Sequence, residues 1–267
     1  MALFSKEQNE AIKFLMRGIS QQGGWKYDQE TDLVDVWGNF SYTGKGLKDF
    51  KGVKFGYVNG DFDCSGNDLT SLEGAPREVK GLFNCANNKL TSLEGAPRKV
   101  DNFNCSGNLL TSLEGGPDIV CRGGYKCSKN NLTSLKGLAR ATGESYRGLE
   151  IDCSGNKLKS LETIGDTERI SEFICRKNEI ISLDGAPLIK GYYGIEAHNF
   201  SYHGNNGISG KTLELIHFTM SSNNVSYLEA LGMLKTQIKA GDLKKLMSGY
   251  ENGDSVLKGA SLLGRFS

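Results

Sequence analysis

The chain has 267 residues and a nearly balanced charge, with 32 Lys and Arg against 31 Asp and Glu. This balance argues against a dedicated nucleic-acid-binding protein, whose binding domain is usually strongly basic, and equally against an acidic mimic of nucleic acid. Glycine is frequent, with 35 residues, while proline is rare, with 4, so the glycines do not form a Pro/Gly low-complexity segment.

An amphipathic helix is predicted near the N-terminus. Residues 5–8 (SKEQ) form a capping-box pattern, and the helical pattern ends before Gly23 and Gly24. Its apolar face consists of Ile12, Leu15, Met16 and Ile19. A helix of this kind can cover the core that is exposed at the end of a repeat array. Residues 1–31 are therefore assigned to a capping helix and a linker.

The middle of the chain repeats one unit, Phe-x-Cys-x-x-Asn-x-Leu-Thr-Ser-Leu, six times between residues 62 and 183. The intervals between the repeated cysteines are 21, 20, 22, 26 and 22 residues, which is typical of a short solenoid repeat. These cysteines are Cys64, Cys85, Cys105, Cys127, Cys153 and Cys175. The longest interval contains residues 141–148, which we interpret as an insertion loop.

Each position of the unit has a structural explanation. Phe and Cys alternate as in a strand, with both side chains in the core, where cysteine acts as a small apolar residue. The asparagine follows the strand, and its amide can satisfy backbone groups of neighbouring coils. The leucines fill the next layer, and Gly-Ala-Pro linkers leave no room for a regular helix on the return. The asparagines are Asn67, Asn88, Asn108, Asn130, Asn156 and Asn178.

Degenerate copies of the unit flank the six. Upstream, the Phe, Cys, Asn, Leu and Leu positions are occupied by Phe40, Tyr42, Lys45, Leu47 and Phe50. Downstream, Ile195 and Ala197 occupy the Phe and Cys positions, 22 residues after Cys175. Residues 32–203 are therefore predicted to form a solenoid of about eight coils with atypical ends.

The last part of the chain, residues 204–267, is predicted to be helical. One helix is expected at residues 211–220, a second begins with the capping box of Ser226 and Glu229, and a third follows Asp242. This segment is longer than a cap requires. Two interpretations stay open: a cap or small appendage, and a separate element for binding or self-association.

No catalytic, cofactor or metal site is predicted. Residues 206–212 resemble a phosphate-binding loop, but Asn205 stands where its first glycine is required, which favours a plain turn. The cysteines are odd in number and fall mostly on one repeat position, which favours reduced thiols in a core over disulfides or a metal ladder. Cys121 lies off the ladder and could be an exposed thiol. No secretory signal occurs in residues 1–13 and no stretch could span a bilayer, so we expect a cytoplasmic protein without membrane contact.

The repeated DCSGN-x-LTSLEGAP wording, together with residues 44–47 and 54–64, resembles leucine-rich-repeat proteins of tailed bacteriophages and bacteria. The resemblance covers about residues 32–190. It implies an α/β-type solenoid with a parallel β-sheet on the concave face, here with an N-terminal capping helix and a C-terminal helical segment. A related bacterial group adds a ubiquitin-ligase domain with a catalytic cysteine, but this chain has no cysteine after Cys175.

The resemblance further implies a protein partner on the concave face. Strand alternation predicts that twelve residues face it: Asp61, Asp63, Leu82, Asn84, Asn104, Lys126, Lys129, Asp152, Ile174, Arg176, Glu196 and His198. Their mixed charge suits a protein better than a nucleic-acid backbone, although a solvated face without a partner would look similar. We expect a non-enzymatic scaffold, phage-encoded, that inhibits or redirects a host bacterial protein, such as a component of antiviral defence. The alternative is an assembly component that forms homo-oligomers through residues 211–267.

Overall fold

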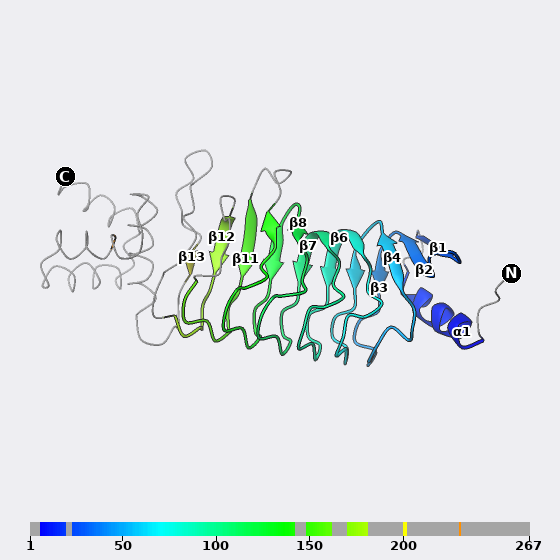
Figure 1. Ribbon diagram of the computed structural model, residues 1–267, viewed down its shortest axis with the longest axis horizontal. Coiled ribbons are helices and arrows are strands. Elements are labelled where there is room, and N and C mark those ends of the chain that lie inside the picture. Colours follow the sequence, from blue (N-terminus) through cyan, green and yellow to red (C-terminus); the bar gives the residue numbers. More distant parts are fainter. Residues whose placement is uncertain are drawn as a thin grey trace, which may run out of the picture.

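The computed structural model describes residues 6–19, 23–141, 148–161, 170–180, 200–201 and 230. These residues form a parallel-strand β-solenoid of about six turns with few helices. The strands stack along the long axis of the molecule, and helix α1 (Lys6–Leu15) lies at the N-terminal end (Figure 1). No helix within the described residues is long and apolar enough to cross a membrane.

The described strands belong to one sheet of 13 strands. Their bounds are β1 (Gly24–Asp28), β2 (Leu33–Trp37), β3 (Phe40–Ser41), β4 (Phe55–Val58), β5 (Phe62–Asp63), β6 (Glu78–Asn84), β7 (Lys99–Asn104), β8 (Ile119–Val120), β9 (Gly124–Lys126), β10 (Arg140–Ala141), β11 (Leu149–Asp152), β12 (Ile170–Ile174) and β13 (Phe200–Ser201). All pair in parallel except β1, which is antiparallel to β2.

The predicted Phe-x-Cys strand is confirmed, and it is only half of the sheet. A phenylalanine row joins β3, β5, the ends of β6 and β7, β9, β11, β12 and β13. A second row, the valine row, joins β2, β4, the starts of β6 and β7, β8 and β10. Its buried residues recur every 20 to 22 positions: Val36, Val58, Val79, Val100 and Val120. The repeat unit written from the cysteines did not contain this row.

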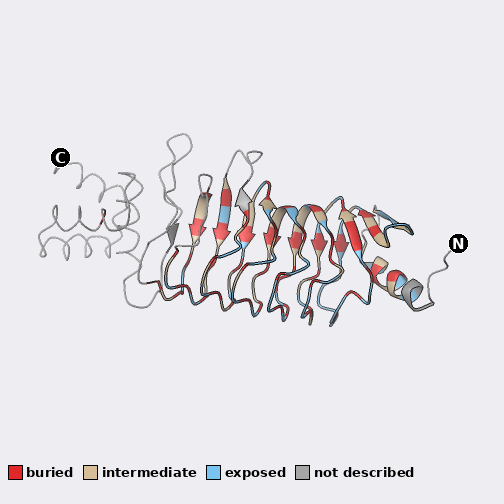
Figure 2. Ribbon diagram, viewed as in Figure 1, coloured by how far each residue is buried: buried red, intermediate tan, exposed pale blue. Residues whose placement is uncertain are grey.

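The core is built as the unit predicts. The rings of Phe62, Phe83 and Phe103 stack with centroids 5.5 and 5.8 Å apart, and the six ladder cysteines are fully buried. Buried residues run along the strands from β2 to β12 (Figure 2). All seven cysteines are free thiols. The expectation that Cys121 could be exposed is wrong, because only 2% of its surface is accessible.

The asparagine ladder is confirmed atom by atom. The amide nitrogen of Asn108 donates to the carbonyl of Cys85 in the preceding coil at 3.0 Å and to that of Cys105 in its own coil at 3.0 Å. Its amide oxygen accepts the N–H of Leu90 at 3.0 Å. The other five ladder asparagines make equivalent bonds. Each buried turn is thereby tied to the one before it, as buried polar backbone groups require.

The N-terminal end differs in part from the prediction. Ile12 and Leu15 of α1 are buried in the core, and a short 3₁₀ turn, η1 (Met16–Gly18), follows the helix. Within residues 1–31, which were assigned to a capping helix and a linker, Gly24–Asp28 form strand β1. This strand pairs antiparallel with β2, and Trp25 and Tyr27 are in register with the buried Val36 and Val34.

The register predicted for the last coil is also wrong. Phe200, and not Ile195, pairs with Phe173, so the final interval is longer than 22 residues. The insertion loop lies almost wholly outside the described residues. So do the three expected C-terminal helices, apart from Ala230, which is helical and buried.

Candidate functional site

The outward side of the phenylalanine row is a continuous line of side chains, one per coil. Register pairing places these residues side by side: Ser41, Asp63, Asn84, Asn104, Lys126, Asp152 and Ile174. Six of the twelve predicted site residues are therefore neighbours on this surface, which we call the strand face. Glu196 and His198 lie outside the described residues, and Ser201 takes the place predicted for Glu196.

Several predicted site residues hold the turn that follows their strand. The Asp63 carboxylate accepts the N–H of Ser65 at 2.9 Å, and Asp152 does the same for Ser154 at 3.0 Å. Asn84 and Asn104 accept equivalent bonds from the residue two places later. Asp and Asn are the residues that favour such turns. The fold alone therefore explains these four polar side chains, whereas Lys126 and Ile174 occupy the same position without this bond.

A second line of side chains accepts backbone N–H groups from the next coil, and Asp61 belongs to this line. Asn39 accepts the N–H of Asp61 at 2.9 Å, Asp61 accepts that of Leu82 at 2.8 Å, and Asn102 accepts that of Gly124 at 2.9 Å. Each acceptor lies against a glycine of the next coil, and those glycines are Gly60, Gly81 and Gly123. A β-carbon there would collide with the acceptor oxygen.

The same line shows where the pattern breaks. Leu82 has no acceptor oxygen, and the following coil has Asp101 where the others have glycine. Asp101 instead approaches Arg122, with its Oδ2 3.5 Å from Nε. Leu82 and Asp101 therefore depart from the pattern together.

Lys129 departs from a third structural requirement. Two residues after each ladder cysteine the backbone is left-handed, with φ of 66° at Gly66, 69° at Gly107 and 67° at Gly155. Lys129 and Lys177 adopt the same conformation with φ of 56° and 53°. Such a conformation is unfavourable for a residue with a long side chain. Packing gives no reason for lysine here.

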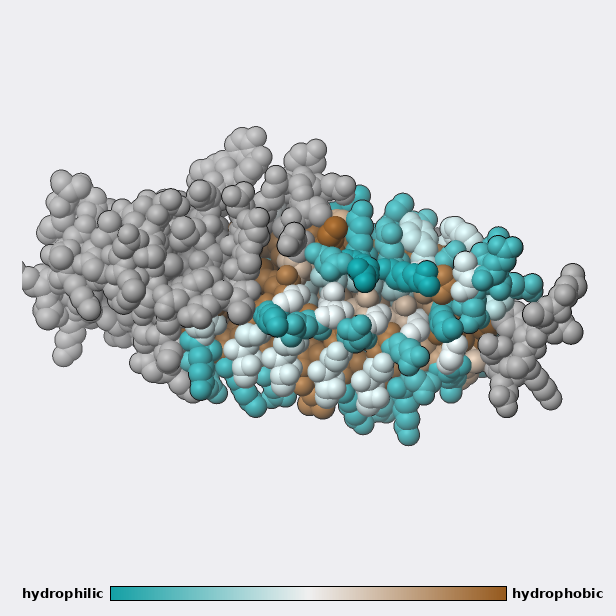
Figure 3. Space-filling model, in the orientation of Figure 1, coloured by the Kyte–Doolittle hydropathy of each residue, from teal (hydrophilic) through white to brown (hydrophobic). Residues whose placement is uncertain are grey.

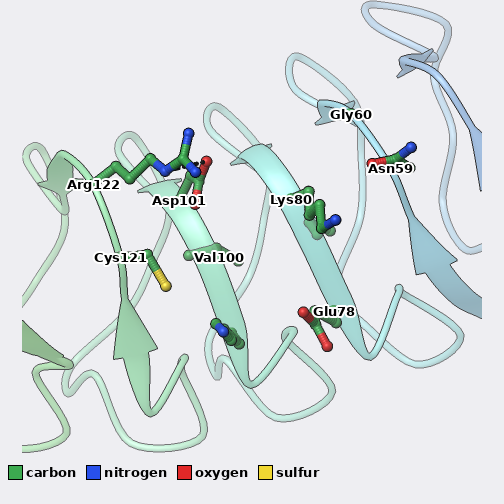
Figure 4. A pocket seen from close by; sticks show the side chains of 10 residues that line it. Asn59, Gly60, Glu78, Lys80, Val100, Asp101, Cys121 and Arg122 are labelled. Atoms are coloured by element: carbon green, nitrogen blue, oxygen red, sulfur yellow. Dashed lines mark ion pairs between the residues drawn. The ribbon is translucent and has the colours of Figure 1, made fainter. Parts of the chain in front are cut away.

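A hollow lies along the valine row, and the sequence interpretation missed it. Its volume is about 300 Å³, and it is lined by Asn59, Gly60, Glu78, Val79, Lys80, Lys99, Val100, Asp101, Cys121 and Arg122. Arg122 extends toward Asp101, and Cys121 lies beside Val100 (Figure 4). The recurrence of valine every 20 to 22 residues was the signal that could have located it.

The ladder thiols are not placed for chemistry. Burial raises the pKa values of Cys64, Cys85, Cys105, Cys127 and Cys153, which keeps these side chains protonated and unreactive. Within the described part of the chain, no group of His, Cys, Asp and Glu residues could hold a metal ion.

On the face of the described residues that Figure 3 shows, hydrophilic side chains alternate with hydrophobic areas. Comparison of the chain with protein-family models, curated proteins and solved structures finds no match. The site is therefore argued from the contacts of these residues alone. The remaining predicted residue, Arg176, is exposed directly after Cys175. Leu82, Lys126, Lys129 and Ile174 are the predicted site residues that stand where other coils have an acceptor, turn-forming or glycine residue.

Proposed function

We propose that this protein is a leucine-rich-repeat scaffold without enzymatic activity, which binds a protein partner through its strand face. The observation that carries the proposal is the set Leu82, Lys126, Lys129 and Ile174. Neighbouring coils place a turn-forming, acceptor or glycine residue at each of these positions. A residue that breaks a structural requirement of its own repeat is best explained by a contact outside the chain.

The shape of the strand face supports a protein partner over a small ligand. Its outward side chains come from strands that lie in register across many coils, which offers a broad surface. Apolar Leu82 and Ile174 are half-buried among charged residues. Leu82 on β6 and Ile174 on β12 are four strands apart, so each is a separate apolar contact within a polar surface, and protein interfaces combine apolar and polar contacts.

The resemblance to repeat proteins of tailed bacteriophages suggests the kind of partner. A phage protein of this type would act in the cytoplasm of the host bacterium and would inhibit or redirect a host protein, such as a component of antiviral defence. This step rests on similarity of repeat wording and not on the geometry of the site.

Affinity capture from a bacterial lysate tests the proposal. The full chain is compared with Leu82→Arg/Lys126→Glu on the strand face and with a matched control, Leu109→Arg/Lys157→Glu. Leu109 is 50% exposed and Lys157 is also exposed, and both lie in the loops after the ladder asparagines. A partner held by the wild type and the control, but lost from the strand-face variant, is the expected result.

Equal retention by both variants would show that the strand face is not the binding site. Sedimentation of the purified chain over a range of concentrations then tests the rival role in assembly. Concentration-dependent growth beyond a discrete monomer or dimer would favour self-association through residues 211–267.

A further inference from the structure

Of four carboxylates near the middle of the strand face, three, those of Asp61, Asp63 and Asp101, already have a partner within the chain. Asp61 accepts the N–H of Leu82, and Asp63 accepts that of Ser65. Asp101 is ion-paired with Arg122. Glu78 lies opposite Lys99 in register, yet the two form no ion pair. Asp61 and Asp63 keep their charge, but their carboxylates are held against the backbone, and none of the four carboxylates is ion-paired with a nearby lysine.

Four cations of the same region are available. Lys99, Lys126 and Lys129 form no ion pair with the described residues, and Lys80 lies over the ring of Tyr57, with Nζ 5.9 Å from its centroid. We call Lys80, Lys99, Lys126 and Lys129 the basic centre. They come from β6, β7, β9 and the turn that follows β9.

Two members of the basic centre stand where the fold prefers another residue. Lys126 replaces the Asp or Asn that holds the turn in four other coils. Lys129 replaces a glycine at a left-handed position. Both replacements fall in one coil, and both introduce a positive charge. This coil therefore carries two positive charges at positions where several other coils have a turn-forming residue or a glycine.

An apolar side chain and the hollow lie beside these cations. Leu82 is half-buried and follows Lys80 by two residues, on the strand face between the buried Val79 and Phe83. The hollow of about 300 Å³ lies against Lys80 and Lys99. This volume is at the lower end of ligand-binding pockets and suits a few side chains better than a complete organic ligand.

We infer that the basic centre binds an acidic segment of the partner protein, with an apolar side chain of that segment placed against Leu82. This inference rests on the proposed function and specifies the chemistry of the partner. Acidic side chains of the segment pair with Lys99, Lys126 and Lys129, which form no ion pair with the described residues.

The surrounding charges limit the length of the segment. The outward line carries Asp63 on one side of the basic centre, and Glu150 and Asp152 on the other. Lys99 begins β7, and Lys126 is in register with Asn104 at the end of that strand, five residues later. At about 3.3 Å per residue the two lysines are roughly 17 Å apart along the strands, so an extended segment of about six residues is needed to reach both. A nucleic-acid backbone that continued along the face would meet these carboxylates, which disfavours it.

Fluorescence polarisation with short labelled peptides tests the inference. The probe is a peptide of alternating Glu and Leu. The matched probes replace Glu by Lys, or Leu by Ser, and a single-stranded oligonucleotide is the fourth. The variants are Lys99→Glu/Lys126→Glu and the control Lys48→Glu/Lys159→Glu, which makes the same charge change at exposed lysines outside the strand face. Circular dichroism confirms that each variant is folded.

The Glu-Leu peptide is expected to bind the wild type and the control with equal affinity. Its affinity for the strand-face variant should be at least about tenfold lower, and its binding to the wild type should weaken as the salt concentration is raised. The Lys-Leu peptide should not bind, and the Glu-Ser peptide should bind more weakly. Absence of Glu-Leu binding, an equal loss in the control, or equal binding of the oligonucleotide overturns the inference. If the lysate partner is nevertheless still lost from Leu82→Arg/Lys126→Glu, the proposed function stands and only the acidic segment is refuted.

Discussion

A β-carbon added at Gly116 would lie 3.1 Å from the hydroxyl oxygen of Tyr125. In the two preceding coils the position of Gly116 is held by Ala75 and Ala96, and the position of Tyr125 is held by phenylalanine. The tyrosine hydroxyl therefore occupies space that the alanine methyl takes elsewhere. It is fully buried and has no hydrogen-bond partner among the described residues.

This pair predicts a coupled effect on stability. Tyr125→Phe should raise the free energy of unfolding by about 1 kcal/mol, because it removes an unpaired buried hydroxyl. Gly116→Ala should lower it by about 1–3 kcal/mol in the wild type, through overpacking, and by less in the Tyr125→Phe background. Urea denaturation of both single variants and the double variant measures the coupling. Additive effects would show that Gly116 is not an accommodation to the hydroxyl.

The asparagine ladder predicts a large loss on truncation. Asn108→Ala leaves the carbonyls of Cys85 and Cys105 and the N–H of Leu90 without the side chain that satisfies them. Each unsatisfied buried group costs about 1–3 kcal/mol, so the free energy of unfolding should fall by at least about 3 kcal/mol. Asn131→Ala is the matched control, because Asn131 is only half-buried, and it should change stability by less than about 1 kcal/mol. Equal losses for the two variants would contradict the ladder's role.

The structure of one coil was predictable because most of the residues that build its core lie within one repeat unit. The Phe-x-Cys strand, the asparagine and the two leucines keep fixed spacing, so aligning the cysteines aligned the core. The first coil, with Phe40 in register with Phe62, followed from the same alignment. The valine row was missed because its distance to the next aromatic residue varies, from three residues for Val100 to five for Val120. A bulge between the two rows absorbs this variation.

The site was only partly predictable, for a different physical reason. Strand alternation correctly placed Asp63, Asn84 and Lys126 side by side on one face. It could not show that Asp61 is bonded to the backbone of Leu82, because that bond joins residues 21 positions apart. The structural polar residues and the unexplained ones therefore looked alike in the sequence. Their separation required the contacts between coils.

The buried thiols predict that stability falls at alkaline pH. Burial raises the pKa of Cys64, Cys105 and Cys153 well above the value of about 8.5 expected in the unfolded chain. Above that pH the unfolded state releases protons that the folded state keeps, so the free energy of unfolding declines as pH rises. Below about pH 7.5 these thiols contribute no pH dependence.

The expected decline approaches about 1.4 kcal/mol per pH unit for each such thiol. Urea denaturation between pH 7 and 9.5, with a reducing agent present, measures it. Cys105→Ala should reduce the slope of the free energy of unfolding against pH by the contribution of one thiol. This holds whatever the substitution does to stability at pH 7. An unchanged slope in this variant would mean that the Cys105 thiol does not titrate on unfolding.

Replacing Lys129 by glycine is expected to raise the stability of the protein and to weaken its binding of the acidic peptide. Lys129→Gly should raise the free energy of unfolding by about 0.5–1 kcal/mol, because glycine adopts φ of 56° without a steric penalty, and the relief exceeds the entropy that glycine loses. The same change removes a cation of the basic centre and should lower the affinity for the Glu-Leu peptide several-fold. Lys157→Gly, at an exposed position without positive φ, should leave peptide binding unchanged and slightly lower stability. If Lys129→Gly gains stability with no loss of binding, lysine at this position has no part in recognition, and the basic centre reduces to Lys80, Lys99 and Lys126.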